Sequence, residues 1–310
     1  MESNGGSWAN VGEANADDPA PKADFTDDSV RQWLAEGAKH VAHSGVNMVL
    51  YGHDGTAKTG AAMDCRNEAQ KKKGQKVIIF DLDGSAGPIK SHFHGDDENI
   101  VIFDPFIVHK DGKIDYVTTY NKILVTVRYI VEKEDELKLA AVVFDGLDTL
   151  LKICEYVMRY QDMKIDANVQ IKDSWQWSKR NRHYNTVVHL LKRMKCDKLY
   201  TTHLKAKMSW KRVGDKTELG VDSYDPDWEK STPGMMFQKV MMERKVIEDS
   251  VEFVARVEKS KGALDLEGVE HVVAVKRGDT VEWSGIHALL ERFRGVKPEG
   301  ADAKAEASEA

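Results

Sequence analysis

The sequence has few cysteines and no long apolar run. Its three cysteines, Cys65, Cys154 and Cys196, are far apart and form no CxxC pair, which argues against a disulfide framework and against a zinc knuckle. No window approaches the roughly 18 consecutive apolar residues of a membrane span. The N-terminus also lacks the basic-then-apolar pattern of a signal sequence. We therefore expect a soluble, cytoplasmic protein in a reducing compartment, with no membrane partner.

The charge is nearly balanced and mildly acidic. The 310 residues include 45 Lys and Arg against 51 Asp and Glu, giving a formal net charge of -6. This total argues against a protein that coats nucleic acid over its whole surface, although a local basic groove is compatible with it. The length and the 41% hydrophobic fraction allow one large domain or two small ones.

The two ends differ in composition from the rest of the chain. Residues 1–25 are rich in Gly, Ala, Asn, Asp, Ser and Pro and predict a disordered tail. Residues 298–310 hold four acids to one lysine and no large apolar residue, which predicts an acidic disordered tail over 297–310. A single folded domain is expected between them, over residues 26–296, and it contains no internal repeat.

Short apolar runs alternate with helical patterns through most of this domain. Such alternation predicts an α/β fold with a mostly parallel sheet flanked by helices. Two later runs are separated by a Gly-containing turn and predict antiparallel strands that close the sheet. The expected parallel strands are 46–51, 76–83, 99–105, 139–145 and 198–203; the antiparallel strands are 251–260 and 269–278; the helices are 26–41, 58–73, 117–132, 148–160, 184–194 and 285–294.

The sharpest motif is Gly52-His53-Asp54-Gly55-Thr56-Ala57-Lys58-Thr59, between an expected strand and an expected helix. This is the context that a Walker A phosphate loop requires. Lys58 would reach the β and γ phosphates, and the Thr59 hydroxyl would ligate Mg²⁺. Ala57 stands where the motif usually has glycine and is harmless only at negative φ. We predict ATP and Mg²⁺ as ligands, with ATP held by Gly52, Gly55, Thr56, Ala57, Lys58, Thr59 and Gly60.

A second apolar strand, LAAVVFD at 139–145, ends in an acid. Asp145 is placed as a Walker B carboxylate, which would hold Mg²⁺ at the same sheet edge as the phosphate loop. Asp148 follows three residues later, and we expect it to be the N-cap of the next helix. The two motifs together are much more specific than either alone.

These motifs resemble those of RecA-like P-loop ATPases, most closely the small phage-encoded members associated with recombination and single-strand annealing. The resemblance covers about residues 45–290, with specific motifs only at 52–59 and 139–145. It implies a RecA-like core with antiparallel C-terminal strands. It also implies that Asp83, or else Asp81, orients the attacking water, and that Thr202 or His203 senses the γ phosphate. The catalytic set would be Lys58, Asp83, Asp145 and His203.

The resemblance further implies that two segments, after strands 139–145 and 198–203, face single-stranded DNA. Both interleave cations with indoles. Cations neutralise phosphates, and aromatic faces stack on unpaired bases. The residues predicted to bind DNA are Lys172, Trp175, Trp177, Lys179, Arg180, Arg182, Lys205, Lys207, Trp210, Lys211 and Arg212.

Other interpretations of these segments stay open. Trp175 and Trp177 could pack at a subunit interface, and Lys205, Lys207 or Arg212 could reach the γ phosphate of a neighbouring subunit. The polar stretch 214–234 predicts a loop over the nucleotide or DNA. Methionines 235, 236, 241 and 242 predict core or interface packing, and histidines 92 and 94 a solvated loop rather than a metal site.

The leading hypothesis is an ATP-dependent recombinase or annealing protein that binds single-stranded DNA and acts in DNA recombination or repair. It would work as a homo-oligomeric filament or ring with ATP between subunits, and a single-strand-binding protein is a further candidate partner. Two alternatives remain. One is a DNA motor of the helicase or packaging type. The other is an ATP-binding adaptor with weak hydrolysis, which Ala57 and the short Asp83 side chain favour.

Overall fold

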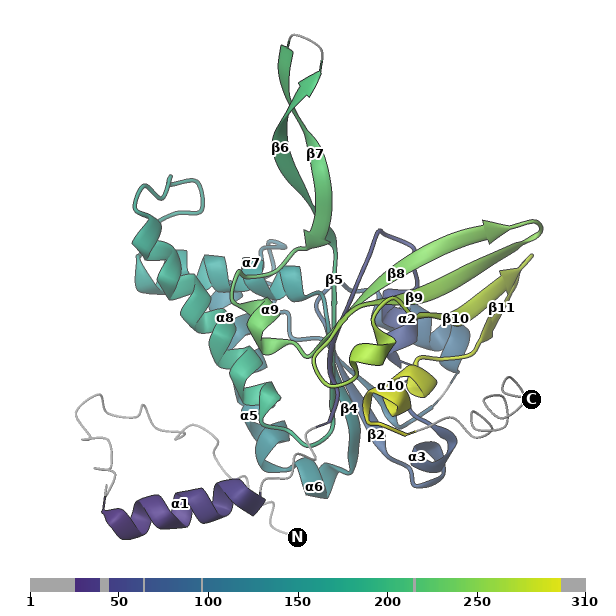
Figure 1. Ribbon diagram of the computed structural model, residues 1–310. Helices are drawn as coiled ribbons and strands as arrows, with labels where there is room; N and C mark the ends of the chain where they lie inside the picture. Colours follow the sequence, from purple (N-terminus) through teal and green to yellow (C-terminus); the bar gives the residue numbers. More distant parts are fainter. Residues whose placement is uncertain (1–25, 40–44, 64, 96, 214–215, 297–310) are drawn as a thin grey trace. The chain divides into compact units, whose positions relative to one another are not determined.

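The computed structural model describes residues 26–39, 45–63, 65–95, 97–213 and 216–296 (Figure 1). The chain divides into two units, residues 1–43 and 44–310, and each is described by itself. In the first unit, helix α1 spans Asp27–Lys39, and the backbone N–H of Ser29 donates to Oγ1 of Thr26 at 3.3 Å, which is an N-cap contact. Both predicted tails lie outside the described residues, and the domain bounds 26–296 stay a prediction.

The second unit is built on a nine-stranded sheet with the order β11-β10-β9-β8-β1-β5-β4-β2-β3. The neighbours from β8 to β3 are all parallel, whereas β8, β9, β10 and β11 pair antiparallel. The predicted fold class is therefore confirmed. The strands are β1 (Asn47–Tyr51), β2 (Lys76–Asp81), β3 (Ile100–Phe103), β4 (Leu139–Asp145), β5 (Asp197–Thr202), β8 (Gln238–Ile247), β9 (Ser250–Ser260), β10 (Glu270–Arg277) and β11 (Thr280–Trp283).

Helices cover both faces of this sheet (Figure 1), because its central parallel strands are apolar on both sides. Val142 and Phe144 of β4 face the core that α5, α7 and α8 complete. Ala141 and Val143 face the core that α2 and α10 complete. The helices are α2 (Lys58–Met63), α3 (Glu68–Lys72), α4 (Ala86–Ile89), α5 (Tyr116–Glu132), α6 (Glu134–Leu137), α7 (Leu147–Val157), α8 (Trp177–Lys192), α9 (Thr232–Met235) and α10 (His287–Phe293).

The helix predicted over 58–73 is two helices, α2 and α3. Asn67 and Gln70 form a capping box: Oδ1 of Asn67 accepts from the Gln70 N–H at 2.8 Å, and Oε1 of Gln70 accepts from the Asn67 N–H at 2.9 Å. Such a box starts a new helix. Likewise, α8 begins at Trp177 rather than at 184, so the second half of the first predicted DNA segment is helical.

Strands β6 (Leu204–Val213) and β7 (Lys216–Pro226) form a separate two-stranded antiparallel sheet. We call this hairpin, residues 204–226, the arm; Figure 1 shows it projecting from the end of β5. The prediction of a loop over 214–234 is wrong for residues 216–226, which form β7. The reason is cross-strand pairing: Met208 lies opposite Val221, and Trp210 lies opposite Leu219, which places apolar side chains on one face of the ribbon.

The described helices are also informative about membranes. None of those in the ranges given above has both the length and the apolar character that crossing a bilayer demands.

Candidate nucleotide site

The residues predicted to bind nucleotide meet at one edge of the sheet. In the strand register, Tyr51 lies beside Thr202, and Asp145 lies between Thr201 and Asp81. The carboxyl ends of β1, β5, β4 and β2 therefore share this edge, which is where α/β proteins bind ligands. A cavity of about 700 Å³ lies there. Its lining includes Asp54, Gly55, Thr56, Ala57, Lys58, Thr59, Gly60, Asp83, Ser85, Thr201 and His203.

The phosphate loop curls around the Lys58 ammonium. Its Nζ donates to the carbonyl oxygens of Gly52 at 3.0 Å and of His53 at 2.9 Å. Burial lowers the pKa of Lys58, and nearby carboxylates, led by Asp54, oppose that shift. Phosphate oxygens would replace the two carbonyls as acceptors for this ammonium.

Ala57 has φ +64°, in the left-handed region. The condition of a negative φ, at which an alanine would be harmless, is therefore not met. A non-glycine residue in this region carries strain of about 1–2 kcal/mol. The chain retains the glycine-like loop conformation in spite of the methyl group.

Three hydroxyls surround the Asp145 carboxylate. Thr59 Oγ1 donates to Oδ1 at 2.9 Å, Ser85 Oγ donates to Oδ2 at 3.1 Å, and Thr201 Oγ1 donates to Oδ1 at 2.6 Å. Burial raises the pKa of Asp145, and these hydrogen bonds oppose the shift. Hard oxygen ligands of this kind suit Mg²⁺, so the residues present fit the predicted ion. The sequence reasoning missed Ser85 and Thr201, although both lie at or just after strand ends.

Asp83 lines the cavity and is exposed at its mouth. Thr149 Oγ1 donates to its Oδ1 at 2.8 Å. Desolvation raises the pKa of Asp83 to about 6; the Thr149 hydrogen bond lowers it, and the charge of Asp145 raises it. Asp81, the alternative, is buried, and its Oδ1 accepts from the backbone N–H of Ser85 at 3.1 Å. Asp83 is thus the better placed of the two to meet a water molecule.

His203 lies between two acids from different elements. Its Nδ1 is 3.0 Å from Oδ2 of Asp148, and its Nε2 is 3.1 Å from Oδ1 of Asp54. The N-cap of α7 is Gly146, so the expectation that Asp148 would be the N-cap is wrong. Asp148 is a site residue that sequence reasoning missed; its position on the first turn after the Asp145 strand was the available signal. Thr202, the alternative sensor, is buried and donates to the Asp227 carbonyl at 2.7 Å.

One cluster in the described chain has the spacing of a metal site. One ligand atom from each of Asp83, Asp148 and His203 lies within 4.8 Å of the others. Histidines 92 and 94 belong to a π-helical turn, Lys90–His94, not to the solvated loop expected there. Among the described residues, neither histidine belongs to a group with metal-site spacing.

The two predicted DNA segments present exposed indoles beside cations. Trp175 is 63% exposed, with the Lys179 ammonium 5.9 Å from its ring centroid, and Arg180 stacks over Trp177 at 4.8 Å. On the arm, Trp210 is 71% exposed. Lys205 and Lys207 form ion pairs with Asp227 and Asp225, and Lys172 is exposed. Lys211 and Arg212 lie on β6, but their side chains fall outside the described part of the chain.

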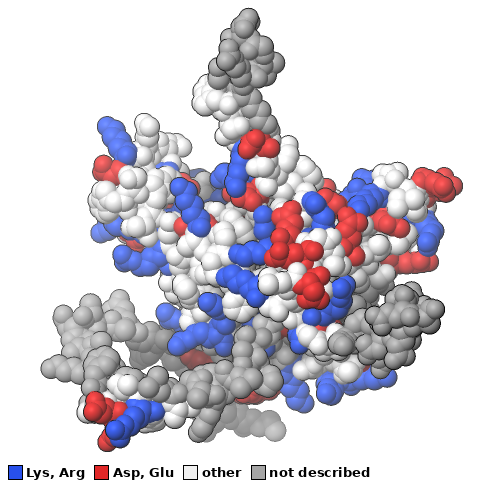
Figure 2. Space-filling view, viewed as in Figure 1, with Lys and Arg blue, Asp and Glu red and all other residues white. Residues whose placement is uncertain are grey.

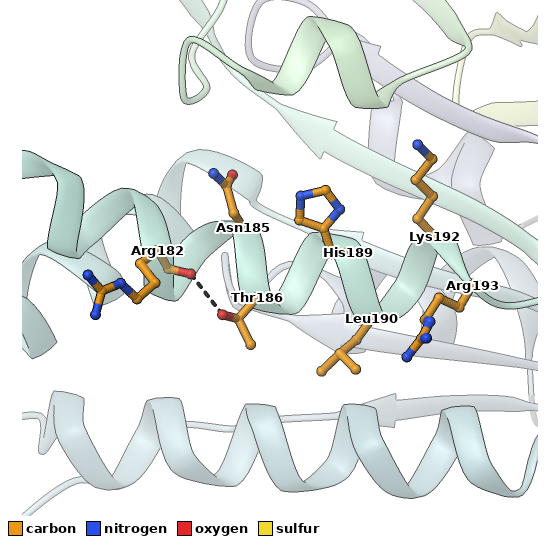
Figure 3. A pocket seen from close by; sticks show the side chains of 7 residues that line it. All are labelled: Arg182, Asn185, Thr186, His189, Leu190, Lys192 and Arg193. Carbon is orange, nitrogen blue, oxygen red and sulfur yellow. Dashed lines mark hydrogen bonds between the residues drawn. The ribbon is translucent and has the colours of Figure 1, made fainter. Parts of the chain in front are cut away.

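A basic groove runs along α8 (Figure 3). It has a volume of about 760 Å³ and is continuous with the first DNA segment through Arg182. Asn185, His189 and Lys192 project to one side of the helix in Figure 3, and Arg182 and Arg193 to the other. In Figure 2, acidic side chains gather over the region of β8 and β9, whereas Lys and Arg side chains are prominent near α8. Sequence reasoning missed this groove because its cations are spread along a helix.

The chain resembles known proteins in structure but matches none of the families or curated proteins in sequence. Among solved structures, the chain is similar to a KaiC-like protein from the hyperthermophilic archaeon Pyrococcus horikoshii OT3, with 13% identity and a TM-score of 0.41 over 74% of this chain and 85% of that one. A likeness this weak adds nothing to the assignment of the site, which depends on the chain's own residues.

Proposed function

We propose that this protein is a magnesium-dependent ATPase of the RecA-like type. One observation carries the proposal: Lys58 and Thr59 of the phosphate loop lie in the same cavity as Asp83 and His203, with Thr59 hydrogen-bonded to Asp145. This set supplies a cation for phosphates, oxygen ligands for Mg²⁺ and a carboxylate for the water.

Each residue has a task that follows from its position. Lys58 neutralises the β and γ phosphates, and the loop N–H groups with the start of α2 orient them. Thr59 and Asp145 would hold Mg²⁺, and the hydroxyls of Ser85 and Thr201 orient the Asp145 carboxylate. Mg²⁺, when bound, supplies charge neutralisation at the phosphate oxygens. Asp83 accepts a proton from, or positions, the attacking water.

Equilibrium binding of ATP with Mg²⁺ and steady-state phosphate release test this proposal. Lys58→Ala should abolish turnover and weaken binding. Lys113→Ala is the matched control, because the Lys113 ammonium pairs with Asp111 on an exposed surface. If the wild-type protein remains empty at millimolar ATP, the ATPase proposal fails. If it binds ATP but never turns it over, with or without DNA, the adaptor alternative is favoured.

We further propose that the ATPase acts on single-stranded DNA, in recombination or annealing. The exposed Trp175 and Trp210 support this, together with Lys179 beside the Trp175 ring and the basic groove on α8. Indoles stack on unpaired bases, and the cations of the groove neutralise the phosphates of the strand. Assembly of subunits with ATP between them, and a single-strand-binding protein as partner, belong to the same proposal.

Single-strand binding with and without ATP tests the DNA assignment. The triple variant Trp175→Ala, Trp177→Ala and Trp210→Ala should lose most of its affinity, since stacking contributes about 1–3 kcal/mol per base. Tyr129→Ala removes an exposed ring from α5 and should bind as the wild type does. DNA binding that survives the triple substitution unchanged would reject this assignment. Directional movement along DNA would favour the motor alternative.

A further inference from the structure

The cavity that holds the phosphate loop has a second, apolar end. Its lining also includes Ile89, Phe93, Phe253, Val281 and Trp283. Phe253 and Trp283 belong to β9 and β11, the antiparallel strands added to the parallel sheet. The cavity therefore joins a polar end that suits phosphates to an aromatic end, and its volume of about 700 Å³ is within the range of small-ligand sites.

Trp283 lies directly against the phosphate-loop helix. A Cβ placed on Gly60 would come within 2.3 Å of the Trp283 indole, so the first turn of α2 and the indole are in close packing. The Phe93 ring meets Trp283 edge to face, with centroids 5.6 Å apart. Phe93 is 36% exposed, which leaves part of its ring available to a ligand.

The indole N–H of Trp283 lies on a buried side of the ring. Within the described residues its Nε1 is buried and has no hydrogen-bond acceptor. A buried donor without an acceptor costs free energy, typically about 1–3 kcal/mol. Since this N–H is closed off, the indole lines the cavity with other atoms of its ring, and a flat aromatic base would meet it by stacking.

We propose that the aromatic end of this cavity, formed by Trp283, Phe93 and Phe253, is the binding site for the purine base of the nucleotide whose phosphates the loop holds. This inference depends on the proposed ATPase function, because it places the base relative to bound phosphates. The base would contact Phe253 of β9 and Trp283 of β11. Purine nucleotides are favoured over pyrimidine nucleotides, because a larger ring system stacks more strongly.

The test compares ATP, CTP and inorganic tripolyphosphate as competitors of a fluorescent ATP analogue, using the full chain with Mg²⁺. Trp283→Ala should weaken ATP binding roughly 10-fold or more, the loss expected for one stacked base. It should leave tripolyphosphate binding within about twofold of wild type, since the phosphate contacts remain. Lys58→Ala should weaken both competitors.

A second variant guards against loss of folding in Trp283→Ala. Phe93→Ala removes a partly exposed ring and should give the same pattern with a smaller change. Tyr160→Ala, an exposed ring that stacks on Tyr156, is the control and should change neither ligand.

The outcomes separate the two proposals. If the wild type binds neither ATP nor tripolyphosphate, the ATPase proposal itself fails. If the wild type binds both, but Trp283→Ala and Phe93→Ala leave the ratio of ATP to tripolyphosphate affinity unchanged, the base site is rejected and the ATPase proposal stands. Equal affinity of the wild type for ATP and CTP would reject the preference for purines.

Discussion

Nε2 of His203 lies 3.1 Å from Oδ1 of Asp54. His203 lies between the end of β5 and the first residue of the arm, so this contact joins the phosphate loop to the base of the arm. A second contact runs in parallel, since the His53 ring meets the Tyr224 ring of β7 edge to face at 5.6 Å. His53 and Asp54 both belong to the phosphate loop and precede Lys58. If the loop rearranges around phosphates, Asp54 moves relative to His203, and His53 moves relative to Tyr224. The nucleotide site and the arm are therefore physically connected.

The first prediction concerns this connection. His203→Ala should lower ATP turnover by about 100-fold, the usual effect of losing one phosphate-stabilising donor. It should lower the free energy of unfolding by about 1–3 kcal/mol, because the Asp54 contact is exposed but the buried Asp148 carboxylate also loses its His203 partner. Steady-state ATPase assays and urea unfolding measure the two effects. Lys133→Ala breaks an exposed pair with Glu136 and should leave turnover intact. Unchanged turnover in His203→Ala would contradict a sensor role.

The second prediction concerns backbone strain in the phosphate loop. Ala57→Gly should raise the free energy of unfolding by up to about 1 kcal/mol, since relief of left-handed strain outweighs the added entropy of the unfolded chain. Gly55→Ala should lower it by about 1–2 kcal/mol. Gly55 has φ +71°, and no atom lies within 4 Å of the place that a Cβ would take, so its change reports strain alone. Urea denaturation compares both variants with wild type, and a stabilised Gly55→Ala would refute the argument.

The third prediction follows from the Asp83 carboxyl. If its ionised form serves hydrolysis, turnover should decline as pH falls through about 6, where this group protonates. Its folded-state pKa of about 6 exceeds the ordinary 3.8, so the folded state binds more protons between these values and its stability falls as pH rises through that window. Asp83→Asn should therefore lose turnover yet be more stable than wild type at pH 7, with a smaller difference at pH 4. Greater stability of wild type at pH 7 would contradict the raised pKa.

The fourth prediction concerns Gly146, whose lack of a side chain leaves room for the Asp83 carboxylate. A Cβ at Gly146 would lie 2.3 Å from Oδ1 of Asp83, and its φ is +103°. Gly146→Ala should reduce turnover strongly and destabilise the fold by about 1–3 kcal/mol. Gly112→Ala is the matched control, because φ there is +82° with nothing near the new methyl group. It should cost stability without loss of turnover. Equal turnover in the two variants would show that Asp83 is not held by Gly146.

Some elements could be predicted because their signals are local. Strand β4 spans 139–145, as its apolar run predicts, and α5 begins one residue before the predicted helix over 117–132. Strand β8 was not predicted, because Met241 and Met242 in a charged stretch indicate packing without specifying a strand. That segment becomes β8 by pairing with β1 and β9, and a single sequence does not display these long-range partners.

The phosphate loop, the acid at the end of β4 and the alternating pattern of a parallel sheet can all be predicted from the chain alone, because each depends on neighbours a few residues apart. Other contacts appear only in the folded chain: Asp148 faces His203, Ser85 and Thr201 donate to Asp145, and Trp283 packs on Gly60. Those contacts join residues from different strands and loops. They exist because the sheet order brings the strand ends to one edge, and that order is set by packing over the whole chain.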